Sequence, residues 1–396
     1  MANVSSSNGL EKRPKLRFPG FDEPWRPIAF GNLVHEYSDR TKEEDEDTLL
    51  SAAIEGMFLN TELFGHQRGA SNKGYKKIKY GTMVLSTQNL HLGNANVNLR
   101  FDHGMVSPAY KTYVITGCSV DLIAQWIKSD AAKRFFYNAT TVGASVCRRN
   151  VEWDTLYEQS LYLPCRDEQE KVAKFLGLLS NRINKQQRFV SALKEYKRGA
   201  IQKLFSETDM EQWNLVKLKD VVKVFDGTHQ TPNYKTTGVR FISVENILDP
   251  LATQKYISED DYRKEFKVHP EYGDVLMTRI GDIGRTYYVN FDSDMAYYVS
   301  LALFKCSPKI EGRFLAAYIS TNTFQKELWE RTLHIAFPKK INTGEIGECS
   351  IRLPSRERQI AIASYLDVIE KKIRLAEKKL DLIQIIKTGL MQQLFI

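Results

Sequence analysis

Two stretches of this chain, residues 163–205 and 353–395, repeat each other and constrain the fold more than any other feature. Aligned without a gap, they are identical at 12 of 43 positions, including Leu-Pro at the start and Gln-x-Leu-Phe at the end. In both copies a seam of mainly apolar residues recurs at alternating steps of four and three. This period is typical of a coiled coil, in which helices cover each other's seam. Two independent surface helices are the alternative, although surface helices rarely keep a strict heptad for so long.

We therefore predict two long helices whose seams pack together. The predicted seam residues are Leu176, Leu179, Ile183, Val190, Leu193, Leu366, Ile369, Ile373, Leu380 and Ile383. Lys197 and Lys387 occupy one equivalent seam slot in the two copies. A polar seam residue can fix the register of a coiled coil, but a Lys near a helix end can also extend its ammonium group to water.

The repeat continues outside the helices, because Trp25 and Trp213 open similar apolar segments. Both intervening regions show short β-like runs broken by Gly, Asn, Asp and Pro, with a few short helices between them. We predict an α+β chain with internal pseudo-twofold symmetry, in which each of two mixed α/β domains is followed by a long helix. The predicted parts are a flexible tail at 1–20, a domain at 21–162, a helix at 163–206, a linker at 207–212, a domain at 213–352 and a helix at 353–396.

Composition and motifs narrow the function classes. The formal net charge of +8 suits a polyanionic partner. No apolar run approaches the ~20 residues of a membrane span. The polar N-terminus lacks the apolar core of a secretory signal, and five cysteines without a C-x-x-C pair favour reduced thiols. We expect a cytoplasmic protein with no membrane partner.

The sequence lacks several common catalytic motifs. The chain has no G-x-x-x-x-G-K-[ST], G-x-S-x-G or H-E-x-x-H motif, and its seven histidines are scattered singly. We therefore predict no catalytic residue, no metal ligand and no cofactor of its own. A self-sufficient DNA enzyme is the alternative, which incubation of the pure chain with DNA and labelled cofactor would test.

Basic and polar loop residues remain as candidates for contacts with DNA. Arg and Lys suit phosphates and guanines, while Asn and Gln suit adenines in the major groove. The candidates are Lys76, Lys77, Thr87, Gln88, Asn89, Arg148, Arg149, His229, Gln230, Thr231, Arg279, Lys339, Lys340 and Asn342. A Lys run is more often a solvated face, and Gln88 and Asn89 can simply cap a turn. The recurrence of basic pairs before both helices favours the binding interpretation.

With these features in order, the chain resembles the specificity subunits of type I restriction–modification systems. The resemblance rests on L-P-x-R-x-E-Q at 163–169 and its copy at 353–359, where Arg358 replaces the Glu. It also rests on FDGTHQTP at 225–232, YGDVLMTRIGDIG at 272–284 and the K-x-G-x-x-Q-x-L-F helix ends. It covers nearly the whole chain after about residue 15, and the matching signal is weaker in the first domain.

This resemblance implies that the two helices form an antiparallel coiled coil and that each domain reads one half of a split, asymmetric site in double-stranded DNA. The coiled coil would set the unread spacer and dock two methyltransferase subunits, and through them two motor-nuclease subunits. It also implies a non-enzymatic subunit, with S-adenosylmethionine, ATP and Mg²⁺ bound by the partners. A coiled-coil adaptor that binds only proteins is the alternative, and salt dependence would discriminate the two because DNA affinity falls steeply with salt.

Overall fold

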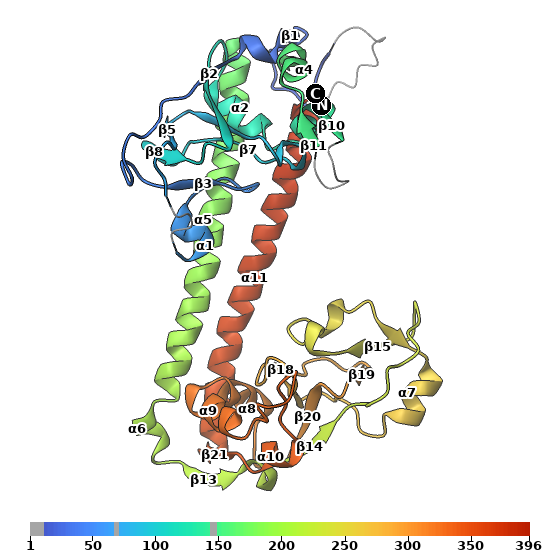
Figure 1. Cartoon of the computed structure of the whole chain (residues 1–396). Helices are drawn as coiled ribbons and strands as arrows, with labels where there is room; N and C mark the ends of the chain where they lie inside the picture. The colour runs from blue at the N-terminus through green and yellow to red at the C-terminus, as the bar shows by residue number, and fades with distance from the viewer. Residues whose placement is uncertain (1–11, 67–70, 143–148) are drawn as a thin grey trace. The chain divides into compact units, whose positions relative to one another are not determined.

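The computed structural model describes residues 12–66, 71–142 and 149–396. The chain divides into two compact units, residues 1–187 with 378–396, and residues 188–377. Two long helices, α5 (Arg166–Leu204) and α11 (Arg356–Leu394), each contribute a part to both units. Within each unit the parts of α5 and α11 lie side by side (Figure 1). The predicted mixed α+β class with paired long helices is confirmed.

The first unit is built on a four-stranded antiparallel sheet of order β2-β9-β6-β7. Its strands are β2 (Val34–Tyr37), β9 (Tyr110–Ile115), β6 (Met83–Ser86) and β7 (Ala95–Val97). Two-stranded ladders surround it, formed by β1 (Arg26–Ala29) with β12 (Ser160–Leu163), β3 (Leu50–Ala52) with β4 (Met57–Leu59), β5 (Lys76–Lys79) with β8 (His103–Val106), and β10 (Thr140–Val142) with β11 (Arg149–Val151). Its short helices are α1 (Asn60–Phe64), α2 (Val120–Trp126), α3 (Asp130–Asn138) and α4 (Trp153–Glu158).

The second unit repeats this sheet in the order β14-β20-β17-β18. Its strands are β14 (Val222–Asp226), β20 (Leu301–Cys306), β17 (Val275–Thr278) and β18 (Thr286–Tyr288). Two further sheets are β13 (Asn214–Lys217) with β21 (Ser350–Leu353), and β16 (Tyr256–Ile257), β15 (Val239–Ile242) and β19 (Met295–Tyr297) in that order. The helices are α6 (Glu207–Met210), α7 (Glu259–Glu265), α8 (Gly312–Ile319), α9 (Asn322–Glu330) and α10 (Thr343–Gly347). The sheet order and the flanking helices therefore recur along the chain.

A buried glutamine fastens each long helix to its globular domain. Gln169 accepts a hydrogen bond from the Ser119 amide at 2.8 Å and donates to the Pro164 carbonyl at 3.0 Å. Its counterpart Gln359 accepts from the Glu311 amide at 2.9 Å and also donates to the Pro354 carbonyl. Both side chains are buried, so these bonds satisfy polar groups that would otherwise be costly to desolvate. The repeated L-P-x-R-x-x-Q run thus fixes where α2 and α8 begin against the long helices.

The heptad positions of α5 and α11 are the buried or half-buried ones. In the first unit, Val172 and Leu176 of α5 belong to the same apolar core as Met391 and Leu394 at the end of α11. In the second unit, Ile362 to Ile373 of α11 share a core with Leu193 and Leu204 at the end of α5. The start of each helix therefore packs with the end of the other, which is the antiparallel arrangement.

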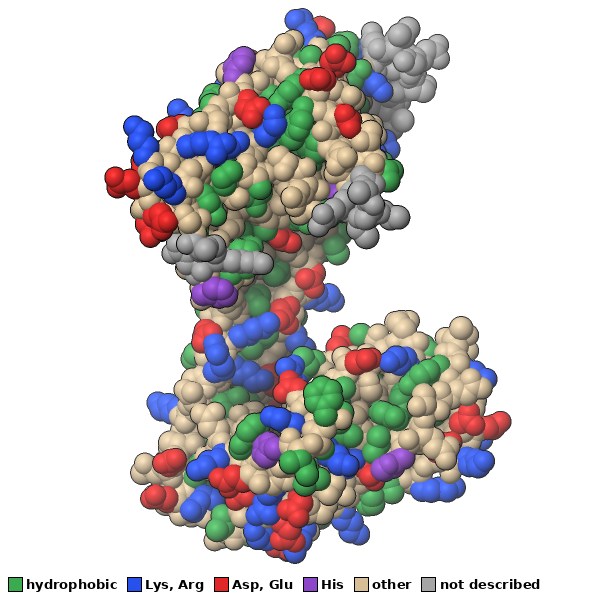
Figure 2. Space-filling view, viewed as in Figure 1, with side chains coloured by type: hydrophobic (Ala, Val, Ile, Leu, Met, Phe, Trp, Pro, Cys, Tyr) green, Lys and Arg blue, Asp and Glu red, His purple; other side chains and the backbone are tan. Residues whose placement is uncertain are grey.

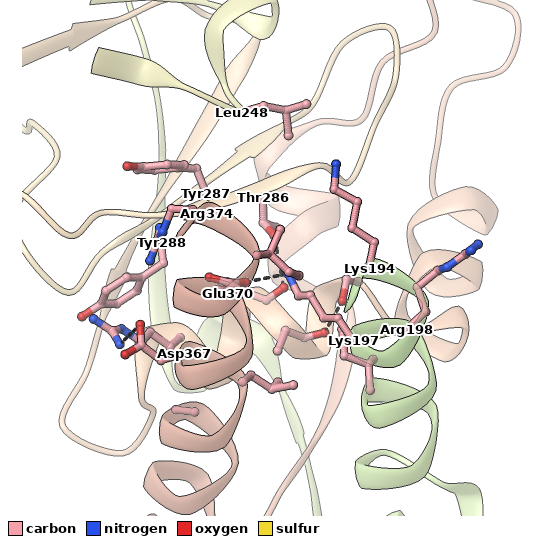
Figure 3. A pocket seen from close by; sticks show the side chains of 18 of the residues that line it. Lys194, Lys197, Arg198, Leu248, Thr286, Tyr287, Tyr288, Asp367, Glu370 and Arg374 are labelled. Carbon is pink, nitrogen blue, oxygen red and sulfur yellow. Dashed lines mark hydrogen bonds and ion pairs between the residues drawn. The ribbon is translucent and has the colours of Figure 1, made fainter. Parts of the chain in front are cut away.

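The two seam lysines have different partners. Lys197 is ion-paired with Glu370 at 2.6 Å in the second unit (Figure 3). In the first unit Ser180 stands where the repeat has Glu370, and Lys387 donates to the Ser180 hydroxyl at 2.7 Å. Burial lowers the pKa of Lys387, since its ammonium group faces a neutral hydroxyl there. The internal symmetry is therefore broken inside the seam.

We expect Lys387→Met to leave the free energy of unfolding unchanged or to raise it by up to ~1 kcal/mol, because it removes a half-buried cation without orphaning an acid. Lys197→Met should lower it by about 0.5–1 kcal/mol, because Glu370 then loses its partner at a partly exposed site. Urea unfolding of the full chain measures both. A larger loss for Lys387→Met than for Lys197→Met would contradict this account.

Residues 12–20, predicted as the end of a flexible tail, make specific contacts. Arg17 forms two hydrogen bonds of 2.8 Å with the buried carboxylate of Glu168. The Leu16 amide donates to the Gln393 carbonyl at 3.0 Å, and the Phe18 ring packs edge-on against Phe175. This segment therefore belongs to the first unit, where it covers the start of α5 and the end of α11.

A half-buried lysine holds the helical layer of the first unit to its sheet. Lys128 donates to the carbonyls of Ile54 and Ala95 and to the Asn96 side chain, at 2.7, 2.9 and 2.6 Å. Burial lowers its pKa to about 8. Between about pH 8 and the ordinary lysine pKa of 10.5, the unfolded chain holds this proton more tightly than the folded chain does. Lys128 therefore makes stability rise with pH in that window.

We expect the unfolding free energy of the wild type, relative to Lys128→Met, to rise between pH 8 and 10 by at most about 1.4 kcal/mol per pH unit. Urea titrations at three or four pH values measure this difference. Lys133→Met, which makes the same substitution at an exposed site on α3, is the matched control. A difference between wild type and Lys128→Met that stays flat from pH 7 to 10 would refute the assignment.

Candidate nucleic-acid interface

Three loops of the second unit converge where β14 and β17 end. The loop after β14 carries His229, whose ring bonds the Asp226 carboxylate at 2.9 Å. The loop after β17 begins at Arg279, whose guanidinium lies 3.7 Å from the same carboxylate. The third is the segment 333–341, whose Ile341 amide donates to the Arg279 carbonyl at 3.0 Å. Residues far apart in sequence are thus gathered at the end of the sheet where β14 and β17 stop.

Arg279 is the buried centre of this cluster. Its guanidinium donates to the carbonyls of Ile341 and Val299 at 3.1 and 2.8 Å, and the residue is only 6% exposed. A guanidinium carries several N–H donors, so one side chain can satisfy several buried carbonyls at once. A direct contact of Arg279 with DNA would have to break these bonds. The arrangement makes it a support for the surrounding loops.

The other candidates of the second unit are exposed around Arg279. Gln230, Thr231, Lys340 and Asn342 have exposed side chains, and so do His229 and Lys339. Lys339 lies over the Trp329 ring at 4.5 Å, and Asn342 precedes the first residue of α10. These cationic, amide and hydroxyl groups are the types that contact phosphates and base edges. Their roles stay predictions.

The candidates of the first unit are more dispersed. Lys76 is buried and donates to the Tyr110 carbonyl at 2.7 Å, while Lys77 pairs with Glu46. Arg149 bonds the hydroxyl and carbonyl of Thr140 and lies over the Tyr137 ring. Binding DNA through these cations would require each to exchange an existing partner.

Two first-unit candidates remain free at the end of β6, which corresponds to β17 in the repeat. Gln88 and Asn89 have exposed side chains, and their backbone N–H groups donate to the Ser86 hydroxyl. The neighbouring Thr87 is half-buried and donates to the Ala109 carbonyl at 2.9 Å. Arg148 lies outside the described residues. The end of β6 is therefore the first unit's best counterpart of the Arg279 cluster.

The apolar tip of the segment 333–340 was not among the predicted site residues. Ile335 and Phe337 are fully exposed, at 100% and 104% of their reference areas. In the sequence, Ile-Ala-Phe looks like a short buried run, so periodicity alone gives no warning of this exposure. The signal that could have found it is the pair of lysines directly after Pro338.

Charge on the visible face of the second unit is mixed, not of one sign (Figure 2). The same holds in a pocket of about 730 Å³ between the long helices and the second domain, where Lys197 pairs with Glu370 and Arg313 with Asp367 (Figure 3). Because these cations are neutralised by neighbouring acids, the pocket does not present a strong positive field. The loop cluster around Arg279 is the better candidate interface.

Known proteins resemble this chain in both sequence and fold. Residues 210–384 match the family model described as the type I restriction modification DNA specificity domain. The matched region contains all of the predicted second domain, 213–352, and most of α11. The type I restriction enzyme MjaVIII specificity subunit of Methanocaldococcus jannaschii is 25% identical over 287 residues, which are 66% of this chain and 67% of the relative. The predicted resemblance to type I specificity subunits is confirmed.

Solved structures show the same fold. A type I restriction–modification S subunit from M. genitalium aligns with a TM-score of 0.62 at 13% identity, covering 97% of this chain and 99% of that chain. A chain from a structure describing assembly and conformational transition of the type I R-M system aligns with a TM-score of 0.55 at 16% identity, covering 96% and 99%. Both likenesses support the duplicated architecture.

No group of three or more His, Cys, Asp or Glu side chains is placed to hold a metal ion in the part of the chain that the structure covers. Over the same residues, no helix has both the length and the apolar character that crossing a membrane requires.

Proposed function

We propose that this chain is a type I specificity subunit, that each of its globular domains reads one half of a bipartite, asymmetric site in double-stranded DNA, and that the paired helices set the unread spacer. The observation that carries the proposal is the duplication: the sheet order and the buried glutamines recur in both halves, while the loops at the strand ends differ. A shared scaffold with different loops suits two readers with different targets.

The long helices supply the spacing. A helix lengthens by ~1.5 Å per residue, so on this proposal the number of residues in the helices would set the spacing of the two readers. DNA half-sites must lie on a suitable face of the duplex, which a rigid spacer can enforce. The off-seam apolar residues of α11 support protein docking, since Val368, Leu375 and Leu382 recur every seven residues and are 50–68% exposed.

On this proposal the subunit is not itself an enzyme. It would hold two methyltransferase subunits on its helices, and through them two motor-nuclease subunits. S-adenosylmethionine, ATP and Mg²⁺ would be bound by those partners and not by this chain. Its place of action would be the cytoplasm, where the DNA is.

The test is a genome-wide map of methylated adenines in a host carrying this chain with its methyltransferase partner, compared with the same host lacking only this chain. We expect a two-part motif with an unread spacer to lose its methylation when the chain is absent. Identical maps would contradict the proposal. No affinity for DNA even at low salt, together with partner binding that salt leaves unchanged, would instead favour the protein-only adaptor.

We expect Lys339→Ala/Lys340→Ala to weaken DNA binding by the assembled complex about equally on all sequences and to flatten the salt dependence by one to two units of slope, roughly one per phosphate contact. Both side chains are exposed beside the loop cluster, so folding should be unaffected. Binding titrations at four salt concentrations measure the slope. Lys326→Ala, on the exposed face of α9, is the control. An unchanged slope would place both lysines away from the phosphates.

A further inference from the structure

The segment Leu333–Lys340 presents an apolar tip on a fixed base. The Leu333 amide donates to the Lys340 carbonyl at 2.8 Å, which closes the segment as a hairpin. The Gly281 amide donates to the Lys339 carbonyl at 2.8 Å, which ties the hairpin to the loop after β17. Since the base is held at several points, the tip can meet a ligand with little further loss of chain entropy.

The buried Arg279 described above is part of that base. Its guanidinium bonds the Ile341 carbonyl, and its own carbonyl accepts from the Ile341 amide. On the other side, the His334 ring bonds the Trp329 carbonyl at 2.9 Å and lies against the indole at 4.2 Å. The hairpin is therefore braced between the sheet edge and the end of α9.

The side chains at the tip are of the kind that opens a base stack. Ile335 and Phe337 are fully exposed, and Pro338 beside them is exposed as well. A partner that buries these side chains removes their apolar surface from water, which favours binding. Phe, Ile and Pro are among the residues that DNA-bending proteins insert between base pairs.

The charge around the tip selects the partner. Residues 331–342 contain three Lys or Arg and no Asp or Glu. Arg331 is paired with Glu327 and Glu345, whereas Lys339 and Lys340 are exposed next to the apolar tip. An apolar wedge flanked by two cations complements a base step flanked by phosphates. A purely apolar protein partner would gain nothing from these cations.

We propose that Ile335 and Phe337 insert between adjacent base pairs of the DNA bound by the second domain and unstack that step, with Lys339 and Lys340 on the neighbouring phosphates. This rests on the proposed function and adds a mode of recognition to it. Flexible pyrimidine–purine steps cost least to open, so the hairpin favours a half-site that contains such a step.

The experiment uses the complex of this chain with its methyltransferase partner and a duplex carrying the site found by the methylation map. 2-Aminopurine is placed at successive positions of the second half-site, outside the methylated adenine. We expect a rise in its fluorescence at one step on binding of the wild type. Ile335→Ser/Phe337→Ser should abolish that rise and weaken affinity about tenfold, with an unchanged thermal midpoint because both side chains are exposed. Leu215→Ser, exposed on β13, is the matched control.

The outcomes separate the two claims. A wild-type complex that binds the duplex while the double variant gives the same fluorescence and affinity would overturn this inference alone. A double variant that loses the methyltransferase partner but otherwise binds DNA unchanged would also overturn it, since the tip would then contact protein. A wild-type complex that shows no affinity for its mapped site would overturn the proposed function, and this inference with it.

Discussion

Replacing residues 21–162 with the first domain of another specificity subunit is expected to change one half of the methylated motif completely and to leave the other half as it was. The first domain has its own cores, which include Trp25, Tyr113 and Leu122, and the second domain has separate ones. Each domain therefore carries its sheet-edge loops as an independent set. Side chains that read bases can be exchanged without disturbing the other reader.

The measurement is the map of methylated adenines in a host carrying the exchanged chain. The graft must keep the start of α2 in place against α5, because the backbone amide of residue 119 donates to the Gln169 side chain of the long helix. The control replaces residues 213–352 with the second domain of the same donor subunit. This exchange should change the other half of the motif. If either exchange altered both halves, the two domains would not read independently.

The helical part of this architecture could be predicted from sequence because a heptad seam is a purely local pattern. Spacing alone identifies which positions of α5 and α11 face another helix. The partner of each seam residue is a different matter, and the two lysines show why. Lys197 and Lys387 look equivalent in the repeat, but one meets Glu370 and the other Ser180. Only the antiparallel pairing brings those residues together.

The candidate interface could be predicted less well, because residue type does not reveal burial. Lys76 and Arg279 are candidates for DNA contacts by residue type, but both are buried and bonded to carbonyls of the chain itself. Residue type misses Phe337 for the opposite reason, since an apolar residue suggests a core position. What distinguishes these residues is the contacts brought by segments distant in sequence, such as Ile341 beside Arg279.

The seam between the long helices is sensitive to charge because its side chains are buried. Ile369 of α11 is 4% exposed in the core of the second unit. We expect Ile369→Asp to lower the free energy of unfolding by about 3–5 kcal/mol, because it buries an unpaired carboxylate and removes apolar contacts. Since domains are stable by only about 5–15 kcal/mol, this loss should also reduce recovery of the complex with the methyltransferase.

The adjacent Val368 provides the control, since it lies on the same turn of α11 but is 50% exposed. Val368→Asp introduces the same charge into the same helix, so it should change the unfolding free energy by no more than about 0.5 kcal/mol. Urea unfolding of both full-length variants measures the difference. Equal losses would mean that the acid acts on the helix itself and not on the seam. A stable Ile369→Asp chain would mean that the two helices do not depend on this contact, and the spacing role proposed for them would lose its physical basis.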